Sequence, residues 1–201
     1  RRFLRAKGWR GTEAAVIGGG FSMSRMGQLA VSRAEFILRA EDLDFSYRLI
    51  RHHPDEAGLV GAAHLMPAWV LEGRDGLLAV DIGGTNIRAG VVEPNIRKSA
   101  DLAKASVWKR ELWRHGDDDP GRGEAVDRLV EMLEELIADA SKAKLKLAPV
   151  IGIGCPGRIG GDGSIHAGAQ NLPGNWEAST FNLPACIRES IPSIGNDETL
   201  V

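Results

Sequence analysis

Asp81 stands at the end of an apolar run and directly before a turn that contains two glycines. The run Leu77–Val80 predicts a buried strand, and the turn residues that follow include Gly83, Gly84 and Thr85. Glycine lets backbone N–H groups approach an anion closely, and the threonine adds a hydroxyl donor. A carboxylate beside such a turn can hold Mg²⁺ through water while the N–H groups hold phosphate oxygens. A plain β-hairpin turn uses the same residue types, so both interpretations remain open at this point.

A second glycine turn lies near the start of the chain. The apolar segment Glu13–Ile17 predicts a short strand, and Gly18-Gly19-Gly20 follows it directly. A strand, a glycine turn and a helix also open a dinucleotide-binding fold, and Glu41 and Asp42 lie at about the distance of its ribose-binding acid. That interpretation is weakened because Met23 stands where a third glycine is expected. A turn without a ligand is the remaining alternative.

Periodicity predicts an α/β protein with a mixed sheet. Strands are expected at Phe45–Ile50, Leu77–Asp81, Ile87–Val92, Ala105–His115 and Pro149–Gly154, and helices at Met23–Leu38, Ala57–Leu65, Val126–Ala140 and Leu183–Ser190. Connecting segments are expected at Pro67–Asp75, Asp117–Gly123 and a glycine-rich hairpin before the last helix. The strand at Leu77–Asp81 should pair antiparallel with Ile87–Val92 and parallel with Pro149–Gly154. The long helix at Val126–Ala140 should pack across them.

The composition limits the classes of function. The 201 residues are 43% hydrophobic and 26% charged, which disfavours disorder, and the net charge of -2 lacks the positive field of a nucleic-acid binder. The apolar runs are far shorter than the roughly 20 residues that span a bilayer, so no membrane partner is expected. Cys155 and Cys186 make no disulfide framework, which favours a reducing, cytoplasmic compartment. The five histidines have no metal-ligand spacing and are expected at solvated or loop positions.

Three motifs in order resemble those of one protein family. Asp81-Ile82-Gly83-Gly84-Thr85-Asn86-Ile87-Arg88 resembles the first phosphate motif of the sugar-kinase, Hsp70 and actin superfamily, and most closely that of the ROK family of bacterial sugar kinases and sugar-responsive repressors. Ile151-Gly152-Ile153-Gly154-Cys155-Pro156-Gly157 resembles the family's Gly-x-Gly-x-Pro-Gly strand and loop. Asn171-Leu172-Pro173-Gly174-Asn175-Trp176 resembles its Asn-Leu-Pro-Gly-Trp segment, with Asn175 as an extra residue. This resemblance covers Leu77 to Val201.

The first 75 residues resemble a different part of the same family. The turn Gly18-Gly19-Gly20 is similar to the adenosine-binding turn near the family's C-terminus, and the segment Asp55–Ala63 is similar to its closing helix. Both precede the phosphate motif here. The order implies a permuted or tandem arrangement, with a partial C-terminal lobe at 1–75 and an N-terminal phosphate and sugar lobe at 76–201. The chain opens on Arg1 and is expected to be a fragment.

The resemblance implies a ribonuclease-H-like mixed sheet and the ATP- and Mg²⁺-dependent phosphorylation of a hexose hydroxyl. It assigns phosphate and nucleotide binding to Asp81, Gly83, Gly84, Thr85, Asn86, Arg88, Gly18, Gly19 and Gly20, with Asp81 also organising Mg²⁺ through water. It assigns the sugar to Gly157, Asn171 and Asn196, and the catalytic base to Asp197. Trp176 is expected to be a packing residue beneath the sugar loop. A homodimer is left open.

Asp197 carries the weakest of these assignments. The residues before it, Ile191–Gly195, do not form a convincing buried strand, and the sequence favours the alternative of a base at the end of a strand beyond Val201. A sugar-sensing regulator without turnover is the alternative function, and a dinucleotide-binding protein built on the first glycine turn is a minor one. The family's second phosphate motif and its Glu/His sugar segment are not found here. The 201-residue chain alone is therefore expected to be inactive as a kinase.

Overall fold

A computed structural model describes residues 6–9, 11–40, 45–193 and 201. Its contacts divide the chain into two compact units, Arg1–Ala57 and Gly58–Val201. The sequence placed a boundary at 75/76 instead. The difference arises because the segment after Gly58 packs its apolar residues onto the sheet of the second unit. The assignment of residues 1–75 to a partial second lobe stays a prediction.

The second unit contains a four-stranded mixed sheet. Its strands are β3 (Gly76–Ile82), β4 (Ile87–Glu93), β5 (Ser106–Trp113) and β6 (Leu147–Gly154), in the order β5-β4-β3-β6. β4 pairs antiparallel with both β3 and β5, whereas β6 pairs parallel with β3. The mixed α/β fold and the predicted pairing are confirmed.

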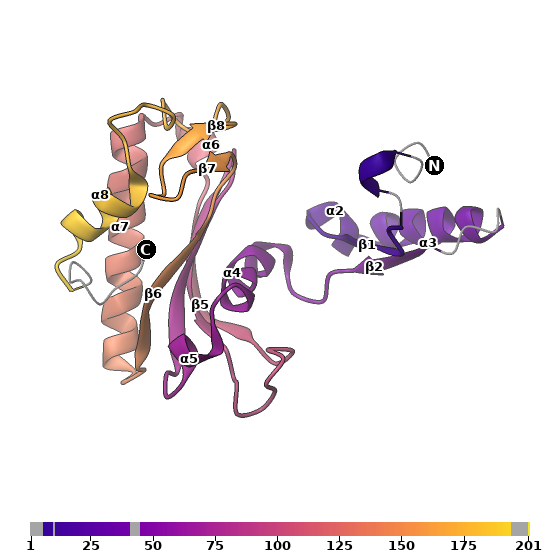
Figure 1. The fold of residues 1–201 in the computed structure, drawn as a ribbon, viewed down its shortest axis with the longest axis horizontal. Helices are drawn as coiled ribbons and strands as arrows, with labels where there is room; N and C mark the ends of the chain where they lie inside the picture. The colour runs from indigo at the N-terminus through magenta and orange to yellow at the C-terminus, as the bar shows by residue number, and fades with distance from the viewer. Residues whose placement is uncertain (1–5, 10, 41–44, 194–200) are drawn as a thin grey trace. The chain divides into compact units, whose positions relative to one another are not determined.

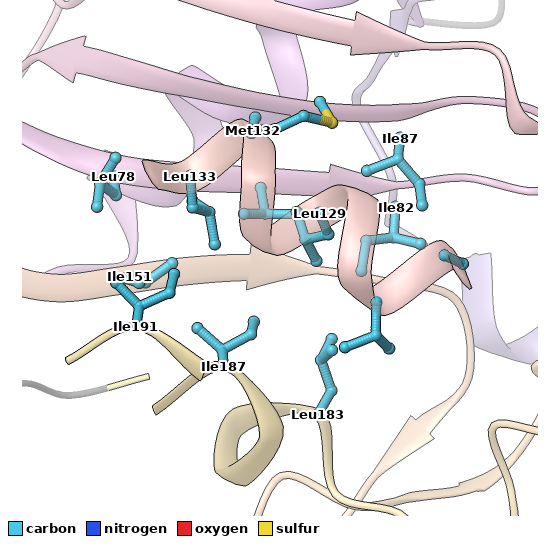
Figure 2. Close-up of a cluster of buried hydrophobic side chains, with 14 of the residues drawn as sticks. Leu78, Ile82, Ile87, Leu129, Met132, Leu133, Ile151, Leu183, Ile187 and Ile191 are labelled. Atoms are coloured by element: carbon cyan, nitrogen blue, oxygen red, sulfur yellow. The ribbon is translucent and has the colours of Figure 1, made fainter. Parts of the chain in front are cut away.

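Helix α7 (Arg122–Lys142) covers one face of this sheet (Figure 1). Its apolar residues recur at helical spacing, so one side of the helix is buried while its charged residues face solvent. Figure 2 shows Leu129 and Leu133 pointing toward the strands, with Ile187 of helix α8 (Leu183–Ser190) closing the same cluster. Among the helices that the structure describes, none is long and apolar enough to cross a membrane.

Helices α4 (Pro54–His64) and α5 (Ala68–Leu71) lie on the opposite face of the sheet (Figure 1). The small residues of α4 let it approach the strands closely, and Leu59 is fully buried there. Helix α5 falls inside Pro67–Asp75, for which the sequence predicts a plain connector. That prediction was wrong because Val70 and Leu71 are buried in this second core and hold a helical turn against it.

Two further elements lie near the ends of β5 and β6. The expected glycine-rich hairpin is present as β7 (Arg158–Ile159) and β8 (Ile165–Ala167). Strand β5 ends at Trp113, and helix α6 (His115–Asp118) follows it, where the sequence predicted a strand to His115 and a loop from Asp117. The strand stops there because its neighbour β4 begins at Ile87, the partner of Trp113, and past this point the Gly116 N–H donates to the Thr85 carbonyl (3.0 Å).

The first unit contains β1 (Ala14–Ile17) and β2 (Ser46–Leu49), which pair in parallel, and the short 3₁₀ helix η1 (Lys7–Trp9). The single helix predicted at Met23–Leu38 is divided into α2 (Gly20–Met23) and α3 (Arg25–Arg39). Ser24 separates them because its hydroxyl oxygen caps α3, accepting a hydrogen bond from the Gly27 N–H (3.0 Å). Several apolar residues of this unit are strongly exposed: Val16, Phe21, Met26, Leu29 and Phe36.

The packing of α7 predicts a large cost for removing one of its core side chains. Leu129 is 0% exposed, so Leu129→Ala should lower the free energy of unfolding by about 2–5 kcal/mol. Leu112 on β5 is 42% exposed, and Leu112→Ala should change it by about 0.5 kcal/mol or less. Urea unfolding of the two variants measures both values. Equal costs would contradict the packing of α7 on the sheet.

Candidate functional site

Asp81 lies at the carboxyl end of β3, beside the carboxyl end of β6. The parallel register pairs Asp81 with Gly154, the last residue of β6. Strand β6 then continues into the loop that contains Gly157. In open α/β sheets, ligands bind in the crevice outside the carboxyl ends of the strands. The register therefore brings the predicted phosphate motif and the start of one predicted sugar loop to the same edge.

The Asp81 carboxylate is partly open to solvent and faces a cation. Its side chain is 33% exposed, and its Oδ2 lies 3.4 Å from Nη1 of Arg88, the residue opposite it in the β3–β4 hairpin. A contact of this length between partly exposed groups is a weak ion pair. No described residue donates a hydrogen bond to Oδ1 of Asp81. The carboxylate thus keeps acceptor capacity for a ligand.

The glycine turn after Asp81 is held from both ends. The Gly83 N–H donates to the Asn86 carbonyl (2.8 Å), which closes the turn. Gly84 and Thr85 are exposed at its tip. Oδ1 of Asn86 is buried and has no hydrogen-bond partner in the described part of the protein. A buried acceptor without a donor costs free energy, so this atom is a candidate contact for a bound group.

His115 supports this turn and was missed by the sequence analysis, which expected the histidines at solvated or loop positions. That expectation is wrong for His115, which is 3% exposed. Its Nε2 lies 2.8 Å from the Gly83 carbonyl oxygen, and its ring packs against Trp113 at 5.8 Å between centroids. No pattern around His115 could show this contact, because the partner is more than thirty residues away in the chain.

The structure brings the second predicted sugar residue to the phosphate turn. A Cβ built on Gly84 would lie 3.1 Å from the Cβ of Asn171, so the turn and the Asn171 loop are in contact. Gly157 has a φ of +121°, and a Cβ there would lie 2.7 Å from the Ala167 carbonyl oxygen. Only glycine fits this position without strain. The loop after β6 is therefore fixed against the hairpin that leads to Asn171.

Trp176 is buried and holds the loop that contains Asn171 in place. It is 1% exposed, its indole N–H donates to the Pro173 carbonyl (2.6 Å), and its ring meets Phe181 edge to face. The prediction of a packing role is confirmed. The loop itself is tied down by Glu177, whose carboxylate accepts a hydrogen bond from the Ala169 N–H (2.8 Å).

The remaining predicted site residues are not brought to this edge by anything that the structure describes. Gly18-Gly19-Gly20 belongs to the other compact unit, where Gly19 has a φ of +88° and precedes α2. Asn196 and Asp197 lie outside the described residues, as do Glu41 and Asp42. Within the described ranges, no group of three His, Cys, Asp or Glu side chains could hold a metal ion.

Both cysteines are free thiols in the described chain. Burial raises the pKa of the Cys155 thiol, because the apolar surroundings disfavour the thiolate. A thiol of this kind is a poor nucleophile at neutral pH. Cys155 therefore contributes packing beside β6, where it contacts the core beneath α7.

Gly58 of α4 is a second residue that the sequence analysis did not connect with the site. A Cβ at this position would lie 2.8 Å from Cγ and 2.9 Å from Oδ2 of Asp81. The helix backbone therefore passes directly against the carboxylate. The small residues Gly58, Gly61 and Ala62 on one side of the helix were the available signal, but they show only that something packs closely and not what it is.

Comparisons with known proteins give a partial match. No family model and no curated protein matches the chain. Among solved structures, it is similar to a ROK hexokinase from Thermus thermophilus, with 21% identity and a TM-score of 0.41 over 63% of this chain and 34% of that chain. It is also similar to an inorganic polyphosphate/ATP-glucomannokinase from Arthrobacter sp. strain KM, with 19% identity and a TM-score of 0.39 over 63% of this chain and 43% of that chain. The chain thus spans about a third of the length of the hexokinase.

The contact between α4 and Asp81 predicts opposite effects for two substitutions in one helix. Gly58→Ala should destabilise the protein by about 1–3 kcal/mol, because the new methyl group overlaps the carboxylate. Gly61→Ala meets no atom within 4 Å and should stabilise the helix by up to about 1 kcal/mol. Thermal unfolding of both variants measures the difference. A Gly58→Ala variant as stable as Gly61→Ala would contradict the close approach.

Proposed function

We propose that this chain carries the phosphate-binding and sugar-framing part of a ROK-type sugar kinase, which transfers phosphate from ATP to a hexose hydroxyl. The observation that carries the proposal is the contact of Gly84 with Asn171 at the sheet edge where Asp81 lies. Two of the three family motifs meet in that contact, and the third runs across the carboxyl end of the neighbouring strand β6. A plain hairpin turn would give no reason for this convergence.

The site fits a magnesium ion that is bound through water. Mg²⁺ usually keeps several of its waters and binds one or two carboxylates together with substrate phosphates. Asp81 offers one carboxylate with a free Oδ1, and the buried Oδ1 of Asn86 can accept a hydrogen bond from a metal-bound water. The ion would neutralise charge that develops on the phosphate oxygens. Thr85 and the turn amides would bind the phosphates directly.

The transfer itself depends on position and charge more than on covalent chemistry. The sugar hydroxyl oxygen forms a bond to the γ-phosphorus while the bond to the ADP oxygen breaks, and the hydroxyl proton goes to a carboxylate base. We assign that base to Asp197 and part of the sugar contact to Asn196, both outside the described residues. Asn171 and the Gly157 loop would hold the sugar so that the attacking oxygen faces the phosphate.

In this proposal, residues of the first unit contact the adenosine of ATP. We assign Gly18-Gly19-Gly20 to the adenosine contact on the resemblance alone, and Arg88 to the phosphates because it lies beside Asp81. The parallel pair β1–β2 with a glycine turn after β1 is compatible with that role. It is equally compatible with dinucleotide binding, and bound nicotinamide or flavin would support that alternative instead.

The proposal predicts a specific loss on removing the Asp81 charge. Asp81→Asn should weaken binding of Mg·ATP by this chain about tenfold or more, because the neutral amide no longer attracts the cation. Asp127→Asn removes an equal charge from the exposed face of α7 and should leave the affinity unchanged. Isothermal titration with Mg·ATP, followed by ATP without Mg²⁺, measures the effect.

The wild-type titration decides the proposal. Mg·ATP binding that depends on Asp81, together with binding of a hexose, supports the kinase assignment. Hexose binding without any response to Mg·ATP would favour a sugar-sensing regulator. Absence of Mg·ATP binding, or an Asp81→Asn variant that binds as tightly as Asp127→Asn, would contradict the assigned role of the carboxylate.

A further inference from the structure

The contact between His115 and the glycine turn has a defined chemical direction. A carbonyl oxygen can only accept a hydrogen bond, so the Nε2 atom of His115, 2.8 Å from the Gly83 oxygen, must carry the proton. One residue further on, the Gly116 N–H donates to the Thr85 carbonyl (3.0 Å). Helix α6 therefore holds two carbonyls of the turn, those of Gly83 and Thr85.

This clamp fixes where the N–H groups of the turn point. In a trans peptide unit, the carbonyl oxygen and the N–H of the following residue point in opposite directions, and the described chain has no cis peptide bond. Holding the Gly83 carbonyl toward His115 therefore directs the Gly84 N–H away from α6. Holding the Thr85 carbonyl toward Gly116 directs the Asn86 N–H away in the same manner. Neither N–H donates to any described residue.

The ring of His115 is itself fixed in place. It is almost completely buried, and Trp113 packs against it on one side. The indole N–H of Trp113 donates to Oδ2 of Asp118 at the end of α6 (2.7 Å), which ties the helix to the end of β5. A rigid donor of this kind holds the turn in one geometry before any ligand arrives. Such preorganisation is what an anion site needs, since the cost of aligning its dipoles is met on folding.

We infer that His115 is a positioning residue, which acts through the Gly83 carbonyl to aim the Gly84 and Asn86 amides at a bound phosphate. This inference rests on the proposed function, because it assumes that the turn binds phosphate. It adds His115, which follows strand β5, to the residues that serve the proposed function. In this role His115 contacts neither the nucleotide nor the sugar. His115 acts only by setting the orientation of backbone groups that do.

Two substitutions separate the hydrogen bond from the volume of the ring. His115→Leu fills much of the same space but has no donor, and His115→Gln keeps an N–H at a similar reach. Mg·ATP should bind about tenfold more weakly to His115→Leu, because the Gly83 carbonyl loses its partner and the turn amides lose their alignment. The Gln variant should restore most of the affinity. In ¹H–¹⁵N spectra, the Gly84 and Asn86 amides should shift on Mg·ATP addition in the wild type and in His115→Gln.

The outcomes distinguish this inference from the proposed function. Wild-type protein that shows no amide shift with Mg·ATP would overturn both. A wild-type response that His115→Leu reproduces in full would overturn the positioning role alone. If the Leu variant does not fold, the ring nitrogens of the unliganded wild type decide instead. A proton on Nε2 supports the clamp, whereas a proton on Nδ1 with a bare Nε2 overturns it, whatever the nucleotide does.

Discussion

Helix α4 can lie directly on the sheet because glycine stands at the points where the two layers touch. Gly58 meets Asp81, a Cβ on Gly152 would lie 2.8 Å from the Cβ of Ala62, and a Cβ on Gly90 would lie 2.9 Å from a side-chain carbon of α4. A side chain in place of any of these glycines would overlap the opposite layer, so the helix and the strands could not approach so closely. The position of Asp81, and with it the start of the glycine turn, depends on this close fit between helix and strands.

Features that are local in the sequence were predicted correctly. The apolar runs that became β3 and β6 and the long apolar stripe of α7 are local patterns, so the type of each element followed from the sequence. Helix α8 forms at its predicted bounds, and the structure shows why it begins there: the Asn182 side chain caps it and a proline stands in its first turn. The candidate phosphate turn was also visible, since its acid and glycines are contiguous.

Features that depend on distant residues were not predictable in the same way. Helix α6 is held by the bonds of Gly116 and His115 to a turn that precedes them by two strands, β4 and β5. The division of the first long helix at Ser24 depends on a side-chain cap that competes with an apolar pattern running through it. In both cases the local pattern predicted a different element from the one observed. A specific hydrogen bond in the folded protein stabilises the observed element instead.

The parallel pairing of β3 with β6 sets an order on the folding reaction. Strands β3, β4 and β5 follow one another along the chain, whereas the whole of α7 lies between β5 and β6. Closing that long loop costs entropy before any contact repays it, and parallel pairing with a distant strand is correspondingly slow. The crevice beside Asp81 is formed by that last pairing. We therefore expect β3, β4 and β5 to pair before β6 joins them, so that the candidate site takes shape late in folding.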